Sequence, residues 1–119
     1  MIKKIIDIGT LDSLVPILAK KINPTAEVWA IDIAEKAIKE MKVTYPEIHY
    51  EVMDLYNLNF EDNHFDYAVA GELIEHLECP SKAIREMFRI LKPKGVLALS
   101  TPLEETEKGE FDKERHLWS

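Results

Sequence analysis

Residues 5–21, IIDIGTLDSLVPILAKK, decide the fold class of this chain. The apolar positions within residues 2–8 predict a short buried strand, and a tight turn at Gly9 follows it. After the turn, apolar residues return at the three- and four-residue spacing of a helix, which Asp12 or Ser13 can cap. We expect this apolar set to face the core: Leu14, Ile17, Leu18 and Ile22.

Strands and helices alternate along the rest of the sequence. Further strands are predicted at 26–33, 48–54, 65–71 and 96–102, and helices at 34–45 and 81–92. The inward residues of the first of these helices are expected to be Ala34, Ala37, Ile38 and Met41. The last helix is expected to be capped by Ser81 and to bury Ile84, Met87, Phe88 and Leu91. This alternation predicts a parallel sheet with right-handed crossovers, and strands this apolar should be covered on both faces.

The composition describes one ordinary globular domain. Of the 119 residues, 46% are hydrophobic and 31% are charged. No apolar run reaches the roughly 18 residues of a membrane span, so no membrane is expected as a partner. The first strand begins too early to leave room for a signal peptide. The single cysteine, Cys79, excludes an internal disulfide and fits a reducing compartment, so we expect a cytoplasmic protein.

The charge of the chain disfavours nucleic acid as a partner. The formal net charge is −7, and the lysines fall in scattered pairs and along one helix rather than in one stripe. A surface that holds a phosphate backbone usually needs such a basic stripe. The lysines are better explained as a solvated polar face.

Acidic residues stand where several predicted strands end. Ligands of open α/β sheets bind beyond the carboxyl ends of the strands, and Asp7, Asp32 and Asp54 lie there. Carboxylates accept hydrogen bonds from ribose hydroxyls and amino groups. Asp32 follows the turn at the distance typical of a ribose-binding acid. Its alternative role is to cap the next helix, and the two roles can coexist.

Two further acids have structural alternatives. A turn-forming role for Asp54 is nearly as well supported as a binding role when that residue is taken alone. Asp66 begins the fourth strand, which is the wrong end for the site, so we interpret it as a structural residue.

Residues 71–80, GELIEHLECP, place two acids and a histidine within five positions. Glu72, Glu75 and His76 can share one face of a helical turn. Such a set can bind a divalent metal or move a proton. The alternative is a polar turn in which His76 packs against neighbouring loops, and the spacing alone favours this alternative.

These segments together resemble the class I S-adenosylmethionine-dependent methyltransferases over nearly all of residues 2–102. IIDIG resembles the first motif of that family, and VWAIDIAEKAIKEMK its second strand and helix. From residue 50 to residue 102 the order and spacing also agree, including IEHL and the later LKPKG. The resemblance implies a Rossmann-like, doubly wound parallel sheet of order 3-2-1-4-5.

The resemblance also implies roles for individual residues. Its cofactor would be S-adenosylmethionine, and its acceptor a small molecule. The implied cofactor-binding residues are Asp7 and Gly9 beneath the methionine portion, Asp32 with Ile33 at the ribose, Asp54 with Leu55 at the adenine, and Gly71 with Glu72 at the methyl-transfer side. Glu75 or His76 would take the proton of the acceptor.

The turn after the first strand departs from the family pattern. Family members carry small residues where Leu11 and Ser13 stand, because the adenosyl group lies against the backbone there. Asp12 adds a negative charge near a helix N-terminus that would otherwise attract the carboxylate of the cofactor. Each change is expected to weaken cofactor binding by about 1–3 kcal/mol.

A second departure is length. The family sheet usually ends in an antiparallel strand pair, which residues 103–119 are too few to form. We therefore predict a domain over residues 1–102, truncated after its fifth strand, and a charged tail or lid over 103–119. A partner subunit or a second copy would then cover the fifth strand, because soluble proteins avoid an exposed apolar edge. The alternative is that the chain is a fragment.

No metal is expected, because many relatives share IEHL without needing one. If a metal binds, its ligands are predicted to be Glu72, Glu75, His76 and His116, a set that resembles that of some metal-dependent O-methyltransferases.

Three classes of function remain open. The best-supported hypothesis is a methyltransferase. The second is a non-catalytic cofactor-binding or structural subunit of a heteromeric methyltransferase. A nicotinamide-dependent dehydrogenase would share the layered sheet, but residues 7–15 lack its glycine pattern.

Overall fold

The computed structural model describes residues 2–11, 13–71 and 73–100. Within them the elements follow in the order β1 (Lys4–Ile8), α1 (Val15–Ile22), β2 (Glu27–Asp32), α2 (Glu35–Thr44), β3 (His49–Val52), β4 (Phe65–Gly71), the short 3₁₀ turn η1 (Ile74–His76), α3 (Pro80–Ile90) and β5 (Leu91–Ser100). The predicted tail at 103–119 lies outside the described residues.

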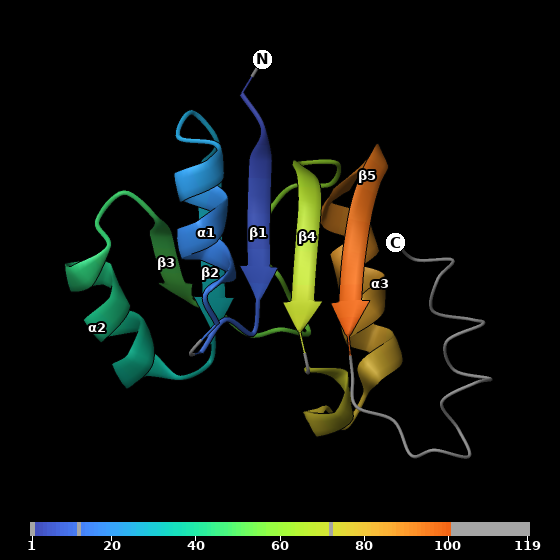
Figure 1. Ribbon diagram of the computed structural model, residues 1–119. Coiled ribbons are helices and arrows are strands. Elements are labelled where there is room, and N and C mark those ends of the chain that lie inside the picture. The colour runs from blue at the N-terminus through green and yellow to red at the C-terminus, as the bar shows by residue number, and fades with distance from the viewer. Residues whose placement is uncertain (1, 12, 72, 101–119) are drawn as a thin grey trace.

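All five strands are parallel and lie in the order β3-β2-β1-β4-β5 (Figure 1). Asp7 of β1 pairs with Ala30 of β2 on one side and with Val69 of β4 on the other. The Rossmann-like α/β architecture and its strand order, predicted from the sequence, are therefore confirmed. The carboxyl ends of β1, β2 and β4 lie along one edge of the sheet.

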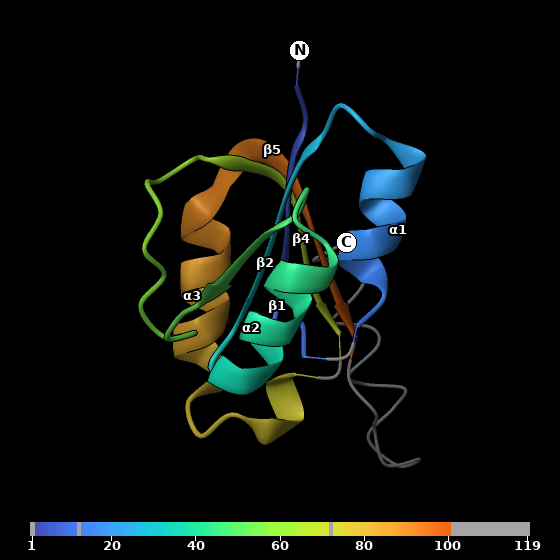
Figure 2. The ribbon, with the colours of Figure 1, turned by 90° about the vertical axis from the view of Figure 1, so that its left-hand side faces the viewer.

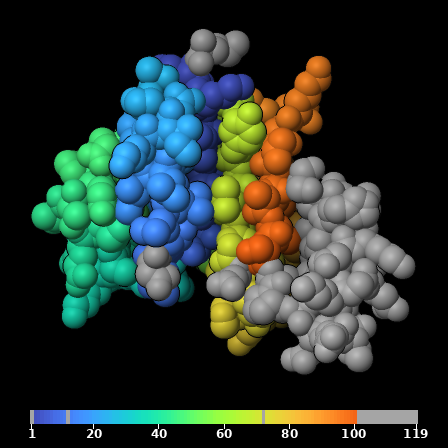
Figure 3. Space-filling view, in the orientation of Figure 1, coloured from blue at the N-terminus to red at the C-terminus, as the bar shows by residue number. Residues whose placement is uncertain are grey.

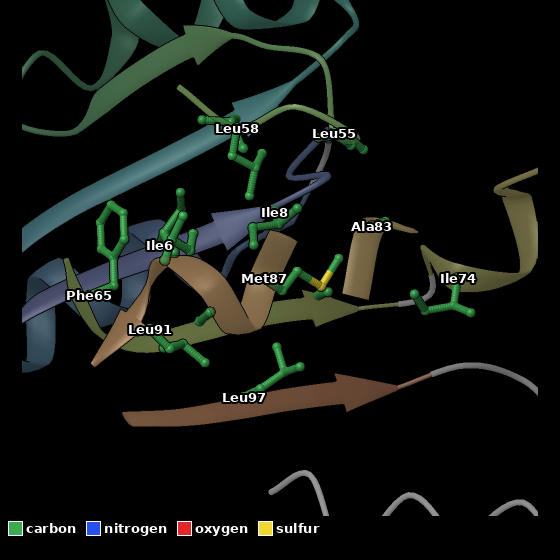
Figure 4. Packing of buried hydrophobic residues seen from close by; sticks show 14 residues of the cluster. Ile6, Ile8, Leu55, Leu58, Phe65, Ile74, Ala83, Met87, Leu91 and Leu97 are labelled. Carbon is green, nitrogen blue, oxygen red and sulfur yellow. The ribbon is translucent and has the colours of Figure 1, made fainter. Parts of the chain in front are cut away.

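The helices cover the sheet from two sides. Figure 2 shows α3 on one face and α1 on the other, with the strands between them. Under α3 the core is built from Ile6, Ile8, Phe65, Met87 and their neighbours (Figure 4). A second core on the opposite face joins Val28, Ala30, Ile38 and Tyr50.

The predicted helix faces are only partly correct. Ile38 of α2 and Met87 of α3 are buried as expected, but Phe88 of α3 is 46% exposed. The predicted buried stripe of α1 is wrong for its leucines, because Leu14 and Leu18 are 65% and 50% exposed, whereas Ile17 packs against the second core as expected. At 100° per residue they lie opposite Pro16, which is the buried residue of this helix. Periodicity finds an apolar face of a helix, but it does not decide which face meets the sheet.

Two expected features of α3 are also wrong. The helix begins at Pro80 with Cys79 as its N-cap residue and has no side-chain cap, so Ser81 does not cap it. The predicted end of the helix at residue 92 is wrong as well, because β5 already begins at Leu91, before the predicted strand at 96–102. A register shift between Phe65 and Tyr67 of β4 accommodates the longer strand.

One part of the sheet is open. On the α1 side of β4 and β5, Tyr67 is 41% and Val96 is 38% exposed, and Ala98 and Ser100 are exposed as well. Figure 3 looks onto this face beside α1. No helix of the described residues covers it, so within them this side of β4 and β5 does not have the cover that was expected for every strand. Among the described residues, no helix is both long and apolar enough to cross a membrane.

Candidate functional site

The turn after β1 is tied to the end of β2 by backbone hydrogen bonds. The amides of Gly9 and Thr10 both donate to the carbonyl oxygen of Ile31, at 2.9 Å each. Gly9 has a φ of 72°, which a glycine adopts at little energetic cost. Leu11 has a φ of 29°, which is unfavourable for a leucine. The turn therefore holds one strained residue directly at the edge of the sheet.

Asp32 fixes both this turn and the start of α2. Its Oδ2 accepts a hydrogen bond from the amide of Leu11, and its Oδ1 accepts one from the amide of Ala34, both at 2.9 Å. The residue is 8% exposed. The alternative role of Asp32 as the cap of the next helix is not borne out, because the N-cap residue of α2 is Ala34 and the helix has no side-chain cap; Asp32 binds the amide of that N-cap residue instead. Each carboxylate oxygen has a second lone pair, so Asp32 retains the capacity to accept a ribose hydroxyl.

Asp7 lies under the turn and is almost fully buried, at 2% exposure. The Thr10 hydroxyl donates to its Oδ2 at 2.7 Å. Burial raises the pKa of Asp7, and the charge of Asp32 adds to this, against the opposing hydrogen bonds from Thr10 and Ser13. Asp7 is therefore a buried acid with a raised pKa at the carboxyl edge of the sheet, and such perturbed acids are common in functional sites.

The segment after β4 reaches the same turn. A Cβ atom at Gly9 would lie 2.8 Å from Cδ1 of Leu73, so Leu73 packs directly on this glycine. At Gly71 a Cβ would meet only Ser100 Oγ at 3.7 Å, which is ordinary contact, so Gly71 is not required for close packing. The structure thus brings the ends of β1, β2 and β4 together, and the contact from Leu73 has no sequence pattern that predicts it.

Residues beyond β3 occupy the next part of the edge. Asp54 is exposed, and its Oδ1 accepts a hydrogen bond from the amide of Tyr56 at 2.9 Å. This is the turn-forming geometry given above as the alternative for Asp54. Leu55 is buried in the core, whereas Ile33, after β2, is 71% exposed at the rim.

Glu75 and His76 lie in η1, with 3.8 Å between Glu75 Oε2 and His76 Nε2. The His76 side chain is 75% exposed and the Glu75 side chain 24% exposed. No group of three or more His, Cys, Asp or Glu side chains that could hold a metal occurs within 2–11, 13–71 and 73–100. Glu72 and His116, two of the four predicted metal ligands, lie outside the described residues.

Asp66, at the opposite end of β4, has a structural role, as predicted. Its Oδ2 accepts a hydrogen bond from the amide of Lys4 at 2.8 Å, and its Oδ1 one from Lys92 Nζ at 3.2 Å. Burial acts to raise the pKa of Asp66, but these two hydrogen bonds outweigh it and lower the pKa. Asp66 therefore joins β1, β4 and β5 at the edge away from the site.

The chain matches the family model for the methyltransferase domain over residues 6–99. A demethylmenaquinone methyltransferase of Listeria monocytogenes is 34% identical over 95 aligned residues, covering 76% of this chain and 40% of that protein. The chain thus spans well under half of this curated relative.

Solved structures share the fold. A Haloferax volcanii methyltransferase in complex with the Trm112 methyltransferase activator has a TM-score of 0.80 at 18% identity, covering 96% of this chain and 51% of that chain. A SAM-dependent methyltransferase of Aquifex aeolicus has a TM-score of 0.69 at 25% identity, covering 82% and 55% of the two chains. The family model matches most of the chain, and the strand order and the acid-lined strand edge agree with that match. The chain therefore belongs to the S-adenosylmethionine-dependent methyltransferase family, with a Rossmann-like fold.

Proposed function

We propose that this chain binds S-adenosylmethionine along the carboxyl ends of β1, β2 and β4 and serves methyl transfer to a small aromatic acceptor. The observation that carries the proposal is Asp32, a nearly buried carboxylate that fixes the turn after β1 and keeps spare acceptor capacity. The aromatic acceptor class is supported by the name of the Listeria relative, a demethylmenaquinone methyltransferase. When bound, the cofactor supplies an activated methyl group.

The proposed contacts follow the edge of the sheet. Asp7 and Gly9 would support the methionine portion from below, and Asp32 would accept hydrogen bonds from the ribose. The exposed side chain of Ile33 offers an apolar contact beside the ribose. Near the adenine we propose Asp54 and Leu55, and near the transferred methyl group Gly71 and Glu72.

Proton removal from the acceptor is proposed for Glu75 or His76. Both belong to η1 directly after β4, and their side chains lie 3.8 Å apart. If either acts as the base, Glu75→Gln or His76→Asn should lower kcat for methylation of a demethylated naphthoquinol about 100-fold. Neither substitution should change the affinity for S-adenosylhomocysteine, and a change in that affinity would contradict the assignment.

A thermal melt with added S-adenosylhomocysteine or NADH tests which cofactor the chain binds. S-adenosylhomocysteine at 100 times its Kd should stabilise the chain by about 2.7 kcal/mol. For a domain of this size that is a rise in Tm of roughly 10 °C or more. The variant Asp32→Asn, which keeps one acceptor oxygen for the backbone amides, should bind about 10-fold more weakly. Glu40→Gln, which removes the same charge from an exposed position of α2, is the matched control and should bind like the unmodified chain.

A second candidate is a non-catalytic or structural subunit of a heteromeric methyltransferase. The open face of β4 and β5 supports it, because Tyr67 and Val96 would be covered by another subunit. Such a partner is compatible with the Haloferax structure, in which a methyltransferase is bound to its activator. In the thermal melt, no stabilisation by S-adenosylhomocysteine would favour this candidate, and stabilisation by NADH would favour a dehydrogenase. In light scattering, a well-behaved monomer would contradict a homo-oligomer. We propose the cytoplasm as the compartment of this protein, because its single cysteine fits a reducing environment.

A further inference from the structure

A second concave site lies on the α3 side of the sheet, between β3 and the segment that joins β3 to β4. The cavity measures about 590 Å³, within the range of small-molecule sites. Trp29, one of its lining residues, pairs with Ile6 and His49 three positions before the end of β2. The cavity therefore runs along the strands from Trp29 to the carboxyl end of β3, where Val52 and Met53 line it.

The wall formed by residues 58–62 is held in place although it has no regular secondary structure. Arg89 of α3 donates hydrogen bonds to the carbonyl oxygens of Leu58 and Phe60 and to the carboxylate of Asp62, all at 2.8 Å. Glu86 fixes Arg89 at 2.7 Å and also accepts from the amide of Leu58 at 2.8 Å. The cavity is thus largely preformed, which lowers the entropy lost when a ligand binds.

Aromatic rings form much of the lining. The rings of Trp29 and Phe60 meet at 87° with 5.1 Å between their centroids, and His64 stacks beside Phe60 at 5.9 Å. Behind the indole of Trp29, His49 stacks at 4.6 Å. Trp29 and Phe60 thus line the cavity as a pair of rings at a right angle, and the electron-rich faces of such rings attract alkylated ammonium groups.

The charged groups of the lining are acidic. Glu51 and Glu61 line the cavity, and no lysine or arginine is among its lining residues. Lys42 lies 3.7 Å from Glu51, but both side chains are about half exposed, so this pair is weak. Glu61 has no ion pair with any residue of the described part of the chain. The lining therefore repels anions and favours a cation.

We propose that this cavity binds an organic cation, specifically an alkylated ammonium group attached to a small apolar body. A metal ion fits less well, because the described residues contain no cluster of three or more side chains that could ligate one. The aromatic corner would hold the alkyl groups, and Glu61 with Glu51 would balance the charge. The lining shares no residue with the site proposed for the cofactor, although it borders that site: the amide of Met53 donates to the carbonyl oxygen of Asp32 at 3.0 Å.

Choline and its neutral carbon isostere, 3,3-dimethylbutan-1-ol, test this directly. The protein contains two tryptophans, so the variant Trp118→Phe leaves Trp29 as the only indole fluorophore. We expect saturable quenching of Trp29 fluorescence by choline and about 3- to 30-fold weaker binding of the neutral isostere. In the same background, Phe60→Leu and Glu61→Gln should each weaken choline binding several-fold, whereas the control Glu78→Gln, on an exposed residue outside the lining, should not.

Several results would overturn the proposal. Equal binding of choline and the alcohol would show an apolar cleft without cation selectivity. Choline binding that survives both Phe60→Leu and Glu61→Gln would place the ligand elsewhere, and an absence of quenching would exclude the site. If Phe60→Leu fails to fold, Glu61→Gln alone decides, since Glu61 is exposed. An unchanged melting response to S-adenosylhomocysteine in Glu61→Gln separates this site from the cofactor site.

Discussion

The turn after β1 and the segment between β3 and β4 both follow parallel strands, but they are stabilised in opposite ways. The turn contains the strained Leu11, and its Thr10 binds the buried acid Asp7 of β1; burial raises the pKa of that acid. The β3–β4 segment is held by α3, where Arg89 binds Glu86 of the same helix together with two backbone carbonyls of the segment. The hydrogen bond from Arg89 lowers the pKa of Glu86, and this effect is larger than that of partial burial, which acts to raise the pKa.

The difference separates a segment suited to ligand binding from one suited to holding the fold. An acid with a raised pKa opposes folding at neutral pH, because the folded state must hold its charge in a poorly solvated place. An acid with a lowered pKa adds stability above its unfolded pKa, and that stability is lost as the pH falls through the folded pKa. Residues that reduce stability at a strand end are therefore better explained by function than by folding.

The largest expected effect is on the β3–β4 segment. Arg89→Ala should lower the free energy of unfolding by about 2–4 kcal/mol, because it leaves Glu86 and two carbonyl oxygens without their main partner. Urea denaturation at neutral pH measures this loss. The matched control Arg85→Ala, on an exposed residue of the same helix, should change stability by less than about 0.5 kcal/mol. Equal losses in the two variants would contradict the structural role of Arg89.

Asp7→Asn should make the turn after β1 more like the β3–β4 segment, because it removes the buried charge that reduces stability there. Removing the buried charge should raise stability at neutral pH and weaken binding of S-adenosylhomocysteine. Since the pKa of Asp7 is raised in the folded state, the stability difference from the unmodified chain should be largest above that pKa and shrink as Asp7 becomes protonated in acid. Denaturant melts between about pH 8 and pH 4 would show this, and a variant less stable at every pH would refute the assignment.

Leu11→Gly should relieve the strain of the turn. The positive φ of Leu11 is unfavourable by about 1–2 kcal/mol for a residue with a Cβ, and glycine removes most of this. The substitution should also tighten binding of S-adenosylhomocysteine, because it removes a side chain where the backbone is expected to approach the cofactor. Calorimetric titration measures the affinity, and unchanged or weaker binding would show that Leu11 does not obstruct the site.

The smallest effect is expected at Tyr50, a buried group outside the site. Burial raises the pKa of Tyr50 to about 12, and its hydroxyl is buried without a hydrogen-bond partner among the described residues. Tyr50→Phe should therefore raise stability by about 1 kcal/mol without changing cofactor affinity. If Tyr50→Phe alters the affinity for S-adenosylhomocysteine as well, the effect of Asp7→Asn on that affinity comes from removing a buried polar group in general, and not from the position of Asp7 at the strand edge.

The sequence predicts the sheet well, because apolar strands alternating with helices admit few topologies. Strand order also followed from a family resemblance that covers most of the chain. The sequence did not fully predict which residues of α1 are buried, since Pro16 is buried and Ile17 packs on the core, whereas Leu14 and Leu18 are exposed. Nor did it predict the network of Arg89, because that network joins residues 27 to 31 positions apart.

For the candidate site, the sequence predicted the strand ends on which its residues stand but not the contacts among those residues. The positions of Asp7, Asp32 and Asp54 at strand ends followed from the alternation of strands and helices. The double hydrogen bonding of Asp32 and the packing of Leu73 on Gly9 depend on the tertiary arrangement of three strands, which local pattern cannot report.

A titration with S-adenosylhomocysteine, followed by NMR at each backbone amide, decides whether the strand edge is the cofactor site. If it is, the amides of Gly9, Leu11, Ile33, Leu55 and Gly71 shift together along one saturable curve, while that of Trp29 stays in place. Saturable shifts confined to other parts of the chain, or no shift at these five amides, would contradict it.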